Sequence, residues 1–217
     1  GEGGQRGRAQ VLVQFANRSC SVLGATDVAA RGLDISQLEM VINVDVTPDS
    51  EIHIHRIGRT GRADEEGWAI SLATMDEMGS VGKIEVLQKA ESDWHKIEEL
   101  TPTAKEPLRP PMATLQIVGG RKEKIRAGDV LGALTGEADG FTVFTREQIG
   151  KINVNEFSTY VAVERKIAGD ALHKPAMGKV KGKSVRVRLM DHEGSVSHTH
   201  LMLTTICGVS ISGVGVS

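Results

Sequence analysis

The sequence contains few cysteines and no long apolar run. Its 217 residues include two cysteines, Cys20 and Cys207, which are too few for a disulfide framework and lack the spacing of metal ligands. No apolar run approaches the roughly 20 residues that span a membrane, and no signal-peptide pattern opens the chain. These absences argue against a disulfide-stabilised secreted domain and against a membrane protein. They predict a cytoplasmic protein without a membrane partner.

The C-terminal tail has no recognisable motif. His192, His198 and His200 are close together in the sequence, but no accompanying carboxylate or cysteine pattern supports a metal site. We therefore expect no bound metal. The end of the tail is rich in Gly and Ser, which predicts that residues 191–217 are flexible.

Charge is distributed unevenly along the chain, although the net charge is only -2. Residues 1–105 contain 11 Lys or Arg and 17 Asp or Glu, a balance of -6. Residues 106–190 contain 15 and 9, a balance of +6. With 40% hydrophobic residues, the chain is suited to one or two domains with apolar cores. We expect two modules, of which the basic one binds a polyanion.

A proline-rich stretch separates the two halves where the charge balance changes sign. Residues 101–111 contain four of the six prolines, and the Pro110-Pro111 pair is incompatible with a helix. We therefore predict a first domain over 1–100, a linker over 101–111 and a second domain over 112–190.

Two polar motifs stand out in the first half. His55–Arg62 contains three arginines at intervals of three residues, which would lie on roughly one side of a helix. Thr26–Asp34 follows the apolar run Ser21–Ala25, which predicts a buried strand, and further apolar runs at 38–44 and 67–73 predict two more. Polar residues that follow a strand lie where open α/β sheets bind ligands.

In this order, the two motifs resemble the fifth and sixth conserved motifs of the DEAD-box RNA helicases. The resemblance implies a truncated RecA-like α/β domain with a parallel sheet, and ATP with Mg²⁺ as cofactors of the full-length enzyme. In that family ATP lies between two RecA-like lobes and RNA crosses both. The first lobe carries Gly-x-x-x-x-Gly-Lys-Thr and Asp-Glu-Ala-Asp, and neither occurs here. We expect the first RecA-like domain to be a missing partner, and expect this chain alone neither to bind nor to hydrolyse ATP.

The resemblance assigns roles around ATP to individual residues. Arg59 and Arg62 match the catalytic arginine fingers that offset charge on the transferring phosphoryl group. Arg31 and Gly32 match the edge of the nucleotide cleft, and Asp34 matches the residue that accepts hydrogen bonds from the ribose.

The same resemblance assigns RNA-binding and inter-lobe roles in this half. Gln5 and Arg8 match a Gln-x-x-Arg motif that contacts RNA at the start of a helix, and Thr26 matches an RNA-phosphate contact. His55 matches the residue that links the two lobes. These roles follow from the family, since spacing alone shows only clustered donors.

After the linker, apolar periodicity predicts the order β-α-β-β-α-β. The strands are expected over 113–118, 149–154, 159–163 and 183–189, and the helices over 127–134 and 165–172. Alternation along 183–189 predicts that Arg186 and Arg188 face solvent together. This order is the split βαβ arrangement of RNA-recognition domains. The half resembles the C-terminal RNA-binding domain of DbpA-type helicases in Gly119–Lys124 and Gly150–Ile152. The resemblance implies an α+β domain that binds structured RNA, a hairpin of large-subunit ribosomal RNA.

This half departs from the usual RNA-recognition pattern in its aromatic residues. Such domains stack bases on aromatics of two central strands, but Gln116 occupies the first position. Tyr160 is clearly placed at the second, where a half-buried strand residue is an equally good interpretation. A stacked base contributes about 1–3 kcal/mol, so Lys and Arg must carry more of the binding. The candidate RNA-binding residues of this half are Arg121, Lys122, Lys124, Tyr160, Lys179, Lys181, Arg186 and Arg188.

These expectations lead to one functional hypothesis with two alternatives. The first is the C-terminal portion of an ATP-dependent RNA helicase that remodels ribosomal RNA during large-subunit assembly. The second is a non-enzymatic RNA-binding adaptor with a degenerate RecA-like half, and the third is a gene fragment that does not fold well. The helicase motifs favour the first, because an adaptor has no use for Arg59, Arg62 and Asp34 together.

Overall fold

The computed structural model describes residues 2–27, 38–61, 66–101, 103, 105–106, 108–136, 143–182, 184–190 and 210–216. The chain divides into two compact units. Unit 1 comprises Gly1–Gly24 and Pro107–His198, and unit 2 comprises Ala25–Glu106 and Thr199–Ser217. The division at Glu106 lies inside the predicted linker. The N-terminal helix α1 (Glu2–Ala16) belongs to unit 1, whereas the sequence pattern grouped it with residues up to 100.

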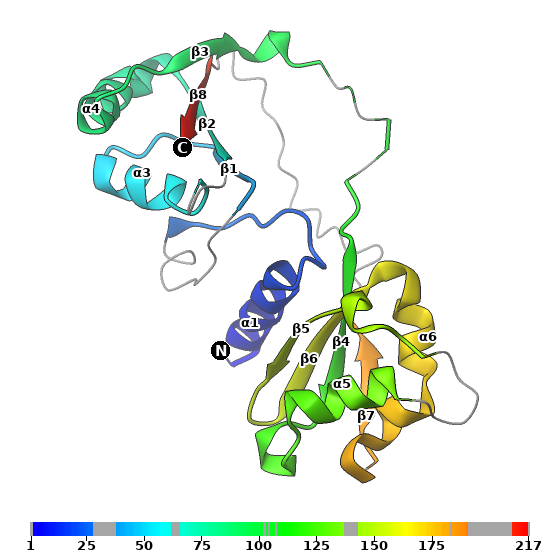
Figure 1. Ribbon diagram of the computed structural model, residues 1–217. Coiled ribbons are helices and arrows are strands. Elements are labelled where there is room, and N and C mark those ends of the chain that lie inside the picture. The colour runs from blue at the N-terminus through cyan, green and yellow to red at the C-terminus, as the bar shows by residue number, and fades with distance from the viewer. Residues whose placement is uncertain are drawn as a thin grey trace. The chain divides into compact units, whose positions relative to one another are not determined.

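Unit 1 is built on a four-stranded antiparallel sheet. Its strands are β4 (Met112–Val118), β5 (Ile149–Val154), β6 (Ser158–Glu164) and β7 (Arg186–Leu189). They lie in the order β5-β6-β4-β7 (Figure 1). The first and third strands of the unit are therefore central, as in the split βαβ arrangement. This confirms the predicted RNA-recognition topology.

Two helices cover one face of this sheet. α5 (Ala127–Thr135) follows β4, and α6 (Ala168–His173) follows β6. The alternation of β4 and β6 turns their branched apolar side chains toward these helices. The core side chains, each at most 2% exposed, include Leu115, Ile117, Val130, Leu134, Val161, Val163 and Met177. The remaining elements of the unit are the 3-10 turns η3 (Arg121–Glu123), η4 (Arg146–Gln148), η5 (Arg165–Ile167) and η6 (Pro175–Gly182).

A buried lysine closes the end of α5. The Nζ atom of Lys174 donates hydrogen bonds to the carbonyl oxygens of Leu134 at 2.6 Å and Gly136 at 2.9 Å. It also lies 5.3 Å from the centre of the Phe144 ring. Burial lowers the pKa of Lys174. A cation at the C-terminus of a helix is favourable, so Lys174 stabilises the packing of α5.

Unit 2 contains a four-stranded sheet of mixed direction. β1 (Met40–Asn43) and β2 (Gly67–Ala73) are parallel neighbours. β8 (Ser210–Val216) lies between β2 and β3 (Asp93–Lys96) and is antiparallel to both. The parallel pair is the part of the predicted RecA-like sheet that the described residues contain.

Two helices pack on one face of this second sheet. α3 (Ser50–Ile57) follows β1, and α4 (Met78–Gln88) follows β2 through the turn η1 (Met75–Glu77). A second turn, η2 (Ile97–Glu99), follows β3. The small core of the unit comprises Val46, Ala73, Val81 and Ile84. Among the described residues of both units, no helix is long and apolar enough to cross a membrane.

The opposite face of β1 and β2 is exposed. Met40, Ile42 and Trp68 are 46%, 56% and 61% exposed, and Met40 pairs with Trp68 in the parallel register. Parallel strands are usually apolar on both faces because both faces are covered. The part of the chain that the structure describes leaves this face uncovered.

The predicted buried strand at Ser21–Ala25 is wrong. These residues form no strand, and Val22 is 74% exposed. They cross the boundary between the two units at Gly24, so no neighbouring strand in either sheet pairs with them. The tail also differs from the flexible segment that composition predicts, since Ser210–Val216 forms β8 along the edge of β2.

Candidate functional site

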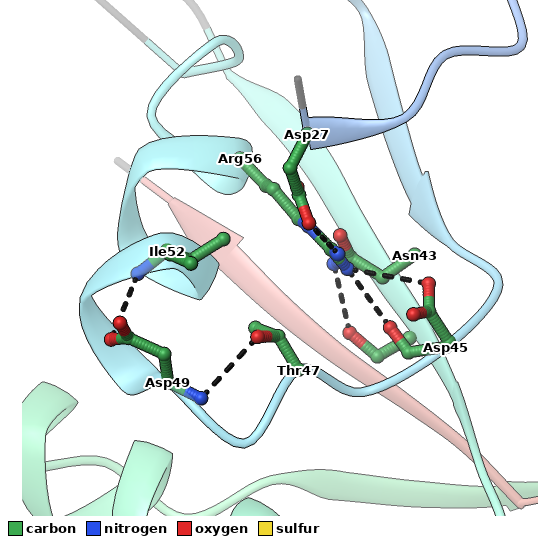
Figure 2. Close-up of polar contacts among 8 residues, drawn as sticks. Asp27, Asn43, Asp45, Thr47, Asp49, Ile52 and Arg56 are labelled. Carbon is green, nitrogen blue, oxygen red and sulfur yellow. Dashed lines mark hydrogen bonds and ion pairs between the residues drawn. The ribbon is translucent and has the colours of Figure 1, made fainter. Parts of the chain in front are cut away.

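The arginine-rich motif begins on α3, whose first turn is capped by Asp49. The Oδ1 atom of Asp49 accepts hydrogen bonds from the backbone N–H groups of Glu51 at 2.9 Å and Ile52 at 3.4 Å. The backbone N–H of Asp49 donates to Thr47 Oγ1 at 3.3 Å (Figure 2). An aspartate in this position satisfies backbone donors that have no partner within the helix. The cap therefore determines where the motif helix starts.

The motif does not continue as a helix beyond Ile57, so the helix that would place its arginines on one side does not extend to Arg59. α3 ends at Ile57 with Gly58 as the capping residue, and Arg59 lies beyond it. Thr60 then donates from Oγ1 to the carbonyl oxygen of Leu38, while the N–H of Leu38 donates to the carbonyl oxygen of Arg59 at 2.9 Å. Pairing with residue 38 thus replaces the next helical turn.

The guanidinium group of Arg56 is hydrogen-bonded to two polar segments of unit 2, one at Asp27 and one at Asp45. Its Nε and Nη2 atoms donate to the two carboxylate oxygens of Asp27 at 2.6 and 2.7 Å. Its Nη1 donates to the carbonyl oxygen of Asp45 at 3.0 Å (Figure 2). Hydrogen bonding to Asp27 and the charges of both carboxylates raise the pKa of Arg56. Arg56 therefore connects the Thr26 motif to the end of β1, a structural role.

Sequence reasoning missed both acidic partners of Arg56. Asp27 stands inside the first motif, and Asp45 follows the apolar run that becomes β1. An acid directly after a strand was the available signal, because such residues gather at the carboxyl edge of a sheet. The bidentate geometry explains why arginine, with its planar fork, occupies position 56.

His53 is buried on α3 beneath this network. It is 6% exposed, and its Nδ1 atom has no hydrogen-bond partner among the described residues. It lines a small cavity together with Ser71 and Gln88. Burial, and secondly the charge of Arg56, lower the pKa of His53 from its ordinary value of 6.5. The imidazole is therefore neutral at pH 7.

Acidification is expected to destabilise unit 2 through His53. Because the folded-state pKa lies below 6.5, the unfolded chain binds a proton first as the pH falls. The free energy of unfolding should fall by up to about 1.4 kcal/mol per pH unit from 6.5 down to the folded-state pKa. Denaturant titrations followed by tryptophan fluorescence measure this, since Trp68 and Trp94 are the two tryptophans and both belong to unit 2. A His53→Gln variant that loses stability just as steeply contradicts the prediction.

The residues expected around ATP are only partly within the described structure. Arg59 is half-buried in the turn after α3, and His55 is exposed on α3. The predicted positions Arg31, Gly32, Asp34 and Arg62 lie outside the described residues. The structure therefore places Arg59 and His55 on one motif and does not test their grouping with the others.

The RNA contacts expected in the first half fall on different units. Thr26 is exposed just before the Asp27 carboxylate, in unit 2. Gln5 and Arg8 lie on α1, which belongs to unit 1. Among the described residues, no group of three or more His, Cys, Asp or Glu could hold a metal, and the three tail histidines lie outside them.

In unit 1, a basic loop is fixed to the neighbouring strand turn by backbone hydrogen bonds. The N–H groups of Arg121 and Lys122 donate to the carbonyl oxygens of Asn155 at 2.8 Å and Glu156 at 3.0 Å. The N–H of Gly120 donates to Glu123 Oε2 at 2.7 Å. The loop is thus held rigidly against the β5–β6 turn.

Exposed cations gather around this loop. We call the surface the basic end, and it comprises Arg121, Lys122, Lys124, Arg126 and Arg186. Arg186 joins it because it pairs with Val118, where β4 enters the loop. The Nζ atom of Lys122 lies 5.8 Å from the centre of the Phe157 ring and 3.2 Å from a carboxylate oxygen of Glu156. Phe157 is 64% exposed, and sequence reasoning missed it, although an aromatic in a strand turn was a signal.

The remaining candidates of unit 1 lie outside the basic end. Tyr160 is only 6% exposed, and its hydroxyl accepts a hydrogen bond from Gln116 Nε2 at 3.1 Å. Arg188 donates from Nε to Gln116 Oε1. Lys179 is exposed on η6, which also carries Lys181. The burial of Tyr160 favours its interpretation as a strand residue.

The predicted alternation of β7 is confirmed, since Arg186 and Arg188 are exposed and Val187 packs against the core.

Two protein families match separate parts of the chain. The helicase conserved C-terminal domain matches residues 1–64. The DbpA RNA binding domain matches residues 114–189, which spans β4 to β7 of unit 1.

Two curated relatives match most of the chain, and a third matches about half of it. The ATP-dependent RNA helicase DbpA of Escherichia coli (strain K12) is 47% identical over 191 residues, covering 86% of this chain and 39% of that protein. DbpA of Bacillus subtilis (strain 168) is 34% identical over 203 residues, covering 84% and 42%. The ATP-dependent rRNA helicase RRP3 of Coccidioides immitis (strain RS) is 43% identical over 99 residues, covering 46% and 21%. The chain thus spans about two fifths of the length of either DbpA protein.

Proposed function

The chain belongs to the DbpA type of the DEAD-box RNA helicases, as the C-terminal part of such a protein, and we propose that it grips ribosomal RNA while the complete helicase remodels it during large-subunit assembly. The partners are a hairpin of large-subunit ribosomal RNA and the first RecA-like domain of the complete protein. The location is the cytoplasm.

The basic end is the observation that carries this proposal. Four of its cations, all except Arg186, lie on a loop whose backbone is hydrogen-bonded to Asn155 and Glu156, so binding needs little further ordering of the chain. The Lys122–Glu156 contact is a surface ion pair, which contributes only about 0–1 kcal/mol. An RNA phosphate can therefore replace Glu156 as the partner of Lys122 at small cost.

The exposed ring of Phe157 favours an RNA hairpin as the ligand of this surface. Proteins read RNA sequence chiefly on unstacked bases of loops and bulges, and they contact paired stems through phosphates and 2′-hydroxyls. An exposed ring beside clustered cations suits both kinds of contact, with a loop base on Phe157 and stem phosphates on the basic end. Lys179 and Arg188 extend the cationic surface of the same unit, and we propose Lys181 as a further RNA contact.

On the nucleotide side, we propose the roles that the family assigns. Arg59 and Arg62 face the phosphates of ATP, Arg31, Gly32 and Asp34 form the ribose edge, and His55 meets the other lobe. When bound with Mg²⁺, ATP supplies the transferable phosphoryl group, which the complete enzyme hydrolyses. This chain alone does not hydrolyse ATP, because positioning of the phosphates supplies much of the rate and its sequence has no phosphate loop.

Equilibrium binding of the full 217-residue chain to labelled RNA hairpins tests the RNA-binding proposal. We expect preference for a ribosomal hairpin over an unstructured RNA of equal length. The logarithm of the affinity should fall linearly with the logarithm of the salt concentration, by about 0.7–0.9 for each phosphate neutralised. The double variant Lys122→Ala/Lys124→Ala should weaken binding and make this slope shallower by about one or two contacts.

A matched control removes the same charge elsewhere. Lys83 on α4 and Lys166 on η5 are both exposed and lie outside the basic end. Lys83→Ala/Lys166→Ala should leave the affinity and the salt slope nearly unchanged. Equal losses in the two double variants would show that binding follows net charge alone, and salt-independent binding would exclude the phosphate contacts.

A further inference from the structure

The central part of the second sheet face in unit 1 is covered. In RNA-recognition domains, the face opposite the helices is the platform on which bases stack. Here the central side chains of β4 and β6 that alternate away from the core are nearly inaccessible: Thr114 is 1%, Gln116 7%, Tyr160 6% and Ala162 1% exposed. Something other than α5 and α6 must therefore cover them.

The cover is the end of α1 and the turn that follows it. Asn17, itself 3% exposed, donates from Nδ2 to Thr114 Oγ1 at 3.4 Å and accepts at Oδ1 from Asn153 Nδ2 at 3.3 Å. The hydroxyls of Ser19 and Thr114 are hydrogen-bonded at 2.6 Å. These contacts join the segment to both β4 and β5.

Hydrogen bonds to the backbone at the start of β4 and after the end of β7 also hold this segment. The carbonyl oxygen of Arg18 accepts from the N–H of Met112 at 3.3 Å, where β4 begins. The Nε2 group of Gln14, which is 4% exposed, donates to the carbonyl oxygen of Met190 after β7. The segment is also closed on itself, since the N–H of Ser19 donates to the carbonyl oxygen of Gln14 at 2.9 Å. The turn therefore orients the polar side chains of Asn17 and Ser19 toward the polar side chains of the sheet.

By sequence, this segment belongs to the other module. The helicase family match covers residues 1–64, yet the polar contacts of residues 14–19 are made with the unit that carries the DbpA match. We infer that the sheet face of unit 1 is a docking surface for Gln14–Ser19 of the same chain, which ties the helicase segment to the RNA-binding unit and covers the centre of the base-stacking face. Tyr160 then positions Gln116 and does not contact RNA. This inference goes beyond the proposed function, since docking requires no RNA.

A designed disulfide tests the docking. Ser19→Cys with Thr114→Cys replaces two bonded hydroxyls by two thiols, in a chain whose native thiols are removed by Cys20→Ser and Cys207→Ser. Under mild oxidation we expect nearly complete intramolecular cross-linking, seen as a faster-migrating monomer on a non-reducing gel and verified by peptide mapping. The control pair, Ser19→Cys with Asp170→Cys, joins the segment to an exposed residue of α6, on the opposite face. Cross-linking no faster than in the control overturns the inference.

The oxidised chain also separates docking from RNA binding. We expect the cross-linked and the reduced chain to bind a ribosomal hairpin with equal affinity. A loss on oxidation that a reductant restores would show that RNA needs the closed face, and it would overturn the second half of the inference. Absence of RNA binding in both states would refute the proposed function, and the cross-linking rate would still decide the docking.

The unmodified chain provides a second measurement. Tyr160 is the single tyrosine of the sequence, so its nitration by tetranitromethane reports one site. We expect nitration to be much slower in the folded chain than in denaturant, with or without RNA. Equally fast nitration in both conditions would show that the face is open and would overturn the inference.

Discussion

Replacing Gly120 by alanine should cost at least about tenfold in RNA affinity, or about 1.4 kcal/mol. A Cβ atom at this position would lie 2.3 Å from the carbonyl oxygen of Asn155 and 2.8 Å from the carbonyl carbon of Glu156. Both are backbone atoms, so no side-chain rotation relieves the clash. The loop must move away from the β5–β6 turn and lose the hydrogen bonds that orient the basic end.

Gly128→Ala is the matched control for Gly120→Ala. Gly128 lies on α5 of the same unit, and a Cβ there meets no atom within 4 Å. This variant should retain its RNA affinity and gain up to about 0.5–1 kcal/mol of stability, because alanine favours helix. Fluorescence anisotropy with a labelled hairpin and a thermal melt of each variant give both quantities. Full affinity in Gly120→Ala would show that the loop geometry does not contribute to binding.

Gly67→Ala should unfold unit 2 more easily by about 1–3 kcal/mol, the usual cost of forcing atoms into a packed site. The added Cβ would lie 2.0 Å from Thr60 Oγ1 and 2.5 Å from the backbone nitrogen of Gly61. Thr60 is 1% exposed and donates to the carbonyl oxygen of Leu38, so it has no free space into which to rotate. The turn that follows Arg59 must therefore shift.

Denaturant titration followed by tryptophan fluorescence measures this cost, since both tryptophans belong to unit 2. Gly79→Ala on α4 is the control, because its Cβ meets no atom within 4 Å, and it should stabilise the unit slightly. RNA affinity should be unchanged in both variants, because the basic end lies in the other unit. A Gly67→Ala chain as stable as its control would show that the turn adapts without strain.

The exposed face of β1 and β2 leads to a related interpretation of unit 2. Met40, Ile42 and Trp68 are apolar, adjacent in register and exposed. Parallel sheets are normally covered on both faces, and the chain spans about two fifths of its DbpA relatives. We expect residues outside those that the structure describes to cover this face.

The amino-acid sequence by itself determined most local elements and the direction of their side chains, although the strand expected at Ser21–Ala25 did not form. Alternation along 183–189 predicted that Arg186 and Arg188 point away from the core, and the strand at 67–73 was found with its bounds unchanged. Strict periodicity suffices here, because successive residues of a strand face opposite sides. The order of the strands in the sheet of unit 1 followed from the element order β-α-β-β-α-β, which is the split βαβ arrangement.

The tertiary structure alone decided which partners these side chains meet. The helix of the arginine-rich motif ends before Arg59, because Thr60 pairs with Leu38 instead of extending α3. Tyr160 is buried on a face that residues 14–19 contact, through bonds such as Asn17 to Thr114, which are 97 positions apart. Local periodicity determines the face toward which a residue points. Which distant segment covers that face depends on nonlocal packing, and no local pattern in the sequence encodes it.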